Sequence, residues 1–101
     1  MRIAFDVDDT ILEHPKLFSV LSNALKGAGH QVYVLTDFDE HFRQHRVDEL
    51  KKIGIAYDEL IITPDKQAAM KERGIEFVFD DDASYYSELK CVPIFIAGNV
   101  E

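Results

Sequence analysis

Apolar positions divide the chain into two kinds of segment. Short apolar runs stand between turn residues, which is typical of buried strands. These runs predict strands at residues 3–5, 31–35, 60–62, 76–79 and 92–97. Between them, apolar residues recur every three or four positions, which predicts helices with one buried face. Strands and helices therefore alternate along the whole chain.

The first two helices have clear ends. Pro15 suits a first helical turn, and Gly27 and Gly29 supply a stop. The predicted buried face of this helix consists of Leu17, Val20, Leu21, Ala24, Leu25 and Ala28. A second helix is predicted over residues 40–53, with Asp39 as its N-cap and Gly54 at its end. Its predicted buried side consists of Phe42, Val47, Leu50 and Ile53.

The last two helices are predicted from their caps. Thr63 and Pro64 are expected to be the N-cap and first residue of a helix that stops at Gly74. Asp82 is expected to cap a short helix over residues 83–90. The resulting β-α-β-α-β-α-β-α-β order predicts an α/β fold. We expect a single Rossmann-like three-layer domain over residues 1–101, with a five-stranded parallel sheet and helices on both faces.

Composition narrows the classes of function. The 101 residues carry 19 acids against 11 Lys and Arg, for a formal charge of −8. This balance argues against a broad nucleic-acid-binding face, so an anionic ligand would need a divalent cation or a well-placed lysine. Cys91 is the only cysteine and is expected to be a small core residue. The first acid stands at Asp6 and interrupts the apolar run, which leaves no room for a leader or membrane span there, so we expect a cytoplasmic protein.

Polar residues follow three of the predicted strands. Asp6 ends the first strand, Thr36 the second, and Asp80 with Asp81 the fourth. The carboxyl ends of parallel strands share one edge, where ligands bind near the reversal of strand order. An isolated acidic turn would explain one such end but not three.

Repulsion between these acids predicts a metal ion. Two carboxylates about 4 Å apart repel by about 4 kcal/mol at an effective dielectric of 20. Asp6, Asp8, Asp80 and Asp81 together therefore favour a hard cation with oxygen ligands, Mg²⁺ rather than Ca²⁺. A calcium loop is excluded, because the glycine and distal glutamate of that motif are missing. Lys66 is expected to point back at this cleft and help hold a phosphate, with Lys71 as the less suitable substitute.

The motifs together resemble those of the haloacid dehalogenase-like (HAD) superfamily. Asp6-Val7-Asp8-Asp9-Thr10 is similar to its first motif, DxDx[TV], and Thr36 to its second. Lys66 matches the third motif, and Asp80-Asp81 the acidic fourth motif in its DD form. The four motifs span residues 3–81 in the family's order.

The resemblance implies a phosphatase mechanism. Asp6 would attack phosphorus and form an aspartyl-phosphate, and Asp8 would act as general acid and then general base. Thr36 and Lys66 would hold the phosphoryl oxygens. Mg²⁺ would be bound by the Asp6 carboxylate, the Asp8 backbone carbonyl and Asp81, with or without Asp80.

Other polar residues near the motifs receive lesser roles. Asp9, Thr10 and Asp37 are expected to shape turns or line the phosphate-binding rim. His41 and His45 are spaced for a shared metal but are expected to be solvated, since no third ligand is evident. Tyr85 and Tyr86 are expected to be partly buried in the core.

Only residues 11–14 separate the first motif from the first helix, which is too few for the cap domain of larger HAD relatives. We therefore expect a minimal capless form with an open cleft. Its partners would be a phosphorylated small molecule, the exposed end of a macromolecule, or a second subunit that covers the site.

Two alternatives remain at this stage. One is a phosphoacceptor or binding module similar to response-regulator receivers, although in those the acceptor aspartate ends the third strand, where this chain has Thr63. The other is a HAD-like domain that has lost turnover and serves as a Mg²⁺- and phosphate-binding interaction module.

Overall fold

A parallel sheet with helices on both faces forms the fold of the computed structural model, which describes residues 1–87 and 93–94. Its four full strands stand in the order β3-β2-β1-β4 and are all parallel. Their bounds are β1 Arg2–Phe5, β2 Gln31–Thr36, β3 Glu59–Ile62 and β4 Phe77–Phe79. Of the predicted fifth strand, only Pro93–Ile94 is described, as β5 beside β4, and its other residues lie outside the described ranges.

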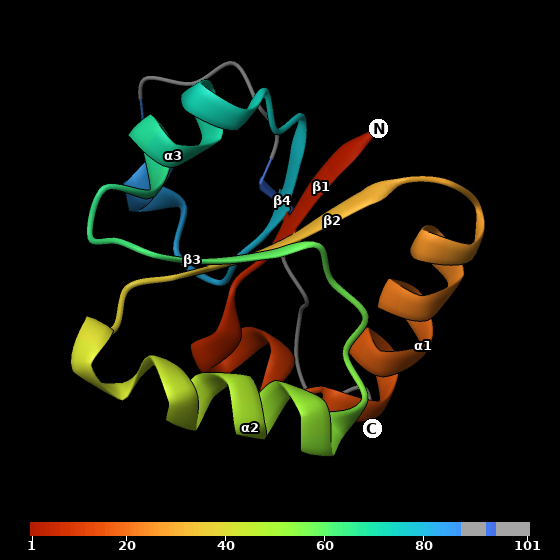
Figure 1. Cartoon of the computed structure of the whole chain (residues 1–101). Helices are drawn as coiled ribbons and strands as arrows, with labels where there is room; N and C mark the ends of the chain where they lie inside the picture. Colours follow the sequence, from red (N-terminus) through yellow and green to blue (C-terminus); the bar gives the residue numbers. More distant parts are fainter. Residues whose placement is uncertain (88–92, 95–101) are drawn as a thin grey trace.

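Helices cover each face of the sheet, as the alternating pattern predicts. Figure 1 shows α1 and α2 on one side and α3 on the other. The helices are α1 Pro15–Gly27, α2 Arg43–Ile53 and α3 Lys66–Arg73. An irregular turn, η1 Val7–Ile11, follows β1, and two short 3₁₀ segments are η2 Glu40–Phe42 before α2 and η3 Ala83–Tyr86 after β4.

Alternate residues of β1 and β2 point to opposite faces and so divide the core in two. The core under α1 and α2 contains Phe5, Phe18, Val34 and Leu50. The core under α3 contains Ala4, Leu35, Met70 and Val78. Because both faces of the central strands are buried, β1 and β2 are nearly continuous apolar runs.

The buried face of α1 agrees with the prediction only in part. Leu21 and Leu25 pack against the core as expected. Leu17 and Val20 are 42% and 71% exposed, whereas Phe18 and Ser22 are fully buried. Phe18 packs edge-to-face on Phe5, with ring centroids 5.1 Å apart, and Ser22 Oγ accepts a hydrogen bond from the Ala56 N–H. Apolar residues occupy two adjacent stripes of this helix, so spacing alone does not identify the inner one.

The predicted second helix begins with a tighter turn. Asp39 does cap it, accepting from the His41 N–H at 2.9 Å, but residues 40–42 form the 3₁₀ segment η2. Phe42 is consequently 57% exposed rather than buried. Val47, Leu50 and Ile53 pack in the core as predicted. Gly54 ends the helix in the left-handed conformation, with φ of 87°.

Of the other two predicted caps, one is confirmed and one is wrong. Asp82 caps η3, since its carboxylate accepts from the Ser84 N–H, which confirms the prediction. Thr63 does not cap α3. Asp65 does so by accepting from the Ala68 N–H at 3.0 Å, and Thr63 instead accepts from the Asp65 N–H. The third helix therefore starts at Lys66 and stops at Gly74. Of the predicted helix over residues 83–90, positions 88–90 lie outside the described ranges.

Candidate functional site

The site lies where the strand order reverses. From β1 the chain moves outward to β2 and β3, and then returns to place β4 on the other side of β1. Asp6 directly follows β1, and Asp80 directly follows β4. The Asp6 N–H donates to the Phe79 carbonyl at 2.9 Å, which holds the two strand ends in register. Such a reversal opens a crevice at the carboxyl edge of a parallel sheet.

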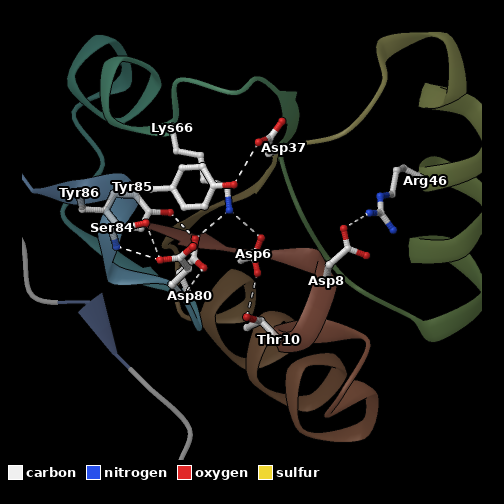
Figure 2. Close-up of polar contacts among 11 residues, drawn as sticks. Asp6, Asp8, Thr10, Asp37, Arg46, Lys66, Asp80, Ser84, Tyr85 and Tyr86 are labelled. Carbon is white, nitrogen blue, oxygen red and sulfur yellow. Dashed lines mark hydrogen bonds and ion pairs between the residues drawn. The ribbon is translucent and has the colours of Figure 1, made fainter.

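Lys66 joins the two aspartates. Its Nζ donates to Asp6 Oδ1 and to Asp80 Oδ2, both at 2.8 Å, and Figure 2 shows it between the two carboxylates. All three side chains are almost fully buried, with residues 4%, 2% and 1% exposed for Asp6, Lys66 and Asp80. The structure therefore brings Asp6, Lys66 and Asp80 into direct contact at this edge of the sheet.

One ammonium facing two buried carboxylates leaves an uncompensated negative charge. Burial raises the pKa of Asp6 to about 7, against the opposing hydrogen bond and charge of Lys66, and the charge of Asp80 adds to the rise. Burial on its own would lower the pKa of Lys66, but Asp6 and Asp80 together raise it. Lys66 therefore stays charged, and Asp6 is the group whose charge depends on what else binds.

The turn after β1 shapes the site. Asp9 has φ of 62°, the only non-glycine residue of the described ranges in the left-handed region, which short polar side chains tolerate best. This turn brings Thr10 back to β1, where its hydroxyl donates to Asp6 Oδ2 at 3.0 Å. Thr10 thus fixes the orientation of the Asp6 carboxylate, so that one oxygen faces Thr10 and the other faces Lys66.

Asp80 and Asp81 differ in the use of their oxygens. Asp80 accepts from Lys66 and Tyr86 at Oδ2 and from the Asp82 N–H at Oδ1, so both of its oxygens are engaged. Asp81 is exposed, and partial burial against the pocket raises its pKa. Oxygens of Asp6, Asp80 and Asp81 lie within 4.8 Å of one another, which makes a set of hard ligands of the kind that divalent cations bind.

Asp8 does not point at Asp6. Its carboxylate accepts from the Arg46 guanidinium of α2, and Figure 2 shows the two side chains facing each other away from Lys66. Arg46 is 2% exposed, donates to Glu49 Oε1 at 2.8 Å and lies 3.8 Å above the centre of the Phe38 ring. Asp8 nevertheless lines the pocket, as do the predicted rim residues Asp9 and Asp37.

Sequence reasoning missed Arg46, although a signal was available. It precedes Leu50 by four positions and Ile53 by seven, which places an arginine on the apolar face of α2. A buried arginine needs an acidic partner, and Asp8 supplies one.

Thr36 is not on the pocket wall. It is fully buried, and its hydroxyl has no hydrogen-bond partner among the described residues. The following residue, Asp37, does line the pocket. Thr36 therefore does not face the pocket, as its predicted phosphate contact would require, and an unpaired buried hydroxyl is costly enough to call for a partner.

The pocket itself is small and acidic. Its volume is about 160 Å³, and it is lined by Asp6, Asp8, Asp9, Asp37, Lys66, Asp80, Asp81, Asp82 and Tyr85. Seven of these nine residues are aspartates, with Lys66 as the single cation, so any anion that enters meets a negative field unless a metal ion accompanies it.

Both tyrosines after β4 belong to the site. Both rings pack against the core under α3, as predicted. The Tyr86 hydroxyl also donates to Asp80, and the Tyr85 ring lines the pocket. The histidine pair is solvated as expected, with the His41 and His45 side chains 91% and 68% exposed. The predicted core position of Cys91 lies outside the described residues.

Comparison of the chain with protein-family models, with curated proteins and with solved structures found no significant match. Within residues 1–87 and 93–94, no helix combines the length and the apolar character needed to cross a bilayer. Function is therefore inferred from the Asp6–Lys66–Asp80 cluster and its surroundings.

Proposed function

We propose that this chain is a Mg²⁺-dependent phosphomonoesterase, a capless HAD-like enzyme with a Rossmann-like sheet, that works through an aspartyl-phosphate on Asp6. The observation that carries the proposal is the Lys66 ammonium between Asp6 and Asp80 at the reversal of strand order. A nucleophilic carboxylate, a buried cation and further carboxylates for a metal are the groups that phosphoryl transfer through an aspartate needs.

Asp6 is the nucleophile in this mechanism. Thr10 and Lys66 hold its two oxygens, which aims the carboxylate without the need for rearrangement during the reaction. A carboxylate oxygen forms a bond to phosphorus as the ester oxygen leaves with its electron pair. Water then attacks phosphorus, the bond to the Asp6 oxygen breaks, and inorganic phosphate departs.

Asp8 moves the protons. It gives a proton to the departing alkoxide and later removes one from the attacking water. Its carboxylate borders the pocket but is paired with Arg46, so the side chain has to turn toward Asp6 when substrate is bound. Lys66, and Thr36 after a local adjustment, donate to the phosphoryl oxygens.

The acidic cluster fits a bound Mg²⁺. Asp81, the exposed member of the set, would add its carboxylate to those of Asp6 and Asp80, whose oxygens already accept from protein donors. The ion would supply the positive charge that lets a carboxylate approach a phosphate dianion. Three carboxylates around one ammonium match that demand, whereas a site built for a neutral ligand would not concentrate so many acids.

The pocket admits a phosphoryl group and little more. A volume of about 160 Å³ leaves the rest of the substrate outside, so a phosphorylated small molecule or the exposed end of a macromolecule is the expected class.

Phosphate release from an aryl phosphate tests the proposal. We expect activity with Mg²⁺, none with EDTA, and a loss of at least about a thousandfold for Asp6→Asn, because the covalent route is removed. Asp48→Asn, an exposed carboxylate on α2, is the matched control and should keep wild-type activity. Turnover that survives both EDTA and Asp6→Asn would refute the mechanism.

One observation favours a second candidate, a phosphate-binding module without turnover. Asp8, the proposed general base, is paired with Arg46 and does not face Asp6. Hydrolysis of a phosphorylated Asp6 would therefore be slow. Trapping the phosphorylated chain in Mg²⁺ separates the two: a lifetime of minutes indicates the module, and one below a second indicates the phosphatase. A receiver-like version is disfavoured, because β1 lies between β2 and β4 here, whereas the 2-1-3-4-5 order places it between β2 and β3.

A further inference from the structure

The Tyr85 ring covers the Lys66 ammonium. Tyr85 belongs to η3, which follows the acidic residues at the end of β4. Lys66 Nζ lies 4.3 Å from the centre of the ring, within the range of a cation–π contact. Figure 2 shows the ring lying across the ammonium, and Tyr85 is one of the residues that line the pocket.

A hydrogen bond holds the ring in this position. The Tyr85 hydroxyl donates to Asp37 Oδ2 at 3.0 Å, and Asp37 follows β2. Tyr85 comes from the β4 side and Asp37 from the β2 side, so the side chain crosses the end of β1, where Asp6 lies. The hydrogen bond to Asp37 also raises the pKa of Tyr85, which keeps the hydroxyl protonated as a donor.

Lys66 has few directions left for a ligand. An ammonium group has three donors, and two of them are directed to Asp6 and Asp80. The Tyr85 ring lies over the same nitrogen, so a phosphoryl oxygen that approaches Lys66 from the pocket competes with the ring. A charge-assisted hydrogen bond to a phosphoryl oxygen is stronger than a cation–π contact, so the phosphoryl oxygen displaces the ring.

We propose that Tyr85 is the gate of the phosphoryl pocket. Its ring shields Lys66, and it gives way when a phosphoryl group takes the third donor of that ammonium. Tyr85 is thus a positioning residue that acts through Lys66, and this role rests on the proposed function.

The first test needs no turnover. Side-chain nitrogen NMR measures how fast the Lys66 ammonium protons exchange with water. We expect Tyr85→Ala to speed this exchange roughly three- to tenfold, the size of a lost cation–π contact. Tyr85→Phe keeps the ring without the Asp37 tether and should show a smaller increase. Phe42→Ala, which removes an exposed ring at the start of α2, is the matched control. If the Lys66 ammonium protons exchange no faster in Tyr85→Ala than in this control, the proposed role of Tyr85 is overturned.

The second test measures binding of inorganic phosphate with Mg²⁺ by calorimetry. A gate opposes binding, so Tyr85→Ala should bind phosphate roughly three- to tenfold more tightly than wild type. A merely structural role would weaken binding, and that result overturns the proposal. If neither wild type nor Tyr85→Ala binds phosphate, the proposed function is refuted, while the exchange measurement still decides whether Tyr85 shields Lys66.

Discussion

Asp6 shows most clearly how local surroundings determine chemistry. It is buried against the end of β4, with one oxygen toward Thr10 and the other toward Lys66. Burial disfavours its charged form more than Lys66 favours it, so its pKa rises from an ordinary 3.8 to about 7. In the proposed mechanism, Asp6 in this state would be activated by the positive charge that enters the pocket with the substrate.

This raised pKa makes stability depend on pH. Between about pH 4 and pH 7 the folded chain holds a proton on Asp6 that the unfolded chain has lost, so the contribution of Asp6 to stability falls as pH rises through this window. The rise in pKa corresponds to at most about 4 kcal/mol. Asp6→Asn mimics the protonated acid and removes the dependence. We therefore expect the free energy of unfolding of Asp6→Asn, minus that of wild type, to increase from pH 4 to pH 7.

Urea unfolding of both proteins in EDTA measures this difference. Comparing the two chains cancels the opposite dependence of Asp58 and Glu59, whose pKa values are lowered by their hydrogen bonds to Lys26 and Arg73. A difference that stays constant across the window would contradict the burial argument for Asp6.

At the scale of elements, α1 carries the largest departure from the sequence prediction. The helix has apolar residues on two adjacent stripes, and the sheet beneath selects the one containing Phe18. Phe18 contacts Phe5 and Phe79 edge-to-face, with ring centroids 5.1 Å and 5.7 Å away. Phe5 is the last residue of β1 and Phe79 the last of β4, so Asp6 and Asp80 directly follow them. The packing of α1 therefore supports the two strand ends that make the site.

Two substitutions on α1 test which stripe is buried. Phe18→Ala should lower the free energy of unfolding by about 3–5 kcal/mol, because it removes a fully buried ring. Val20→Ala should change it by less than about 0.5 kcal/mol, since that side chain is 71% exposed. Chemical denaturation of both variants checks the pair. Equal losses of stability in the two variants would indicate that Val20 is buried, as the sequence predicts.

For the whole molecule, the excess of acid at one edge links metal binding to folding. Seven aspartates line a pocket with a single cation, so a bound divalent ion relieves repulsion that the unfolded chain does not have. We expect Mg²⁺ at about a hundred times its dissociation constant to add about 2.7 kcal/mol to the free energy of unfolding.

Thermal unfolding with Mg²⁺ and with EDTA measures this gain. Asp81→Asn should abolish most of it, because Asp81 is the exposed member of the ligand set. Asp48→Asn on α2 should leave it intact. An equal stabilisation by Mg²⁺ in wild type and Asp81→Asn would indicate that the metal binds elsewhere than at the predicted ligands.

Much of this organisation could be predicted from local pattern. Apolar runs and glycine stops identify the strands and helices, because burial and backbone conformation impose them on neighbouring residues. The acids after β1 and β4 and Lys66 were predictable as a cluster, since parallel strands deliver their carboxyl ends to one edge. Asp39 and Asp82 were predictable as caps for the same local reason.

The tertiary structure decided what depends on contacts between distant residues. Arg46 meets Asp8 across 38 positions, Tyr85 meets Asp37 across 48, and neither pair has a local signature that specifies its partner. The inner stripe of α1 was settled by the shape of the sheet beneath it, and the cap of α3 by competition between Thr63 and Asp65. The sequence by itself determined which charged groups share an edge, because strand direction is a local property. Only packing determined which of them touch, because that depends on how helices from elsewhere in the chain sit against that edge.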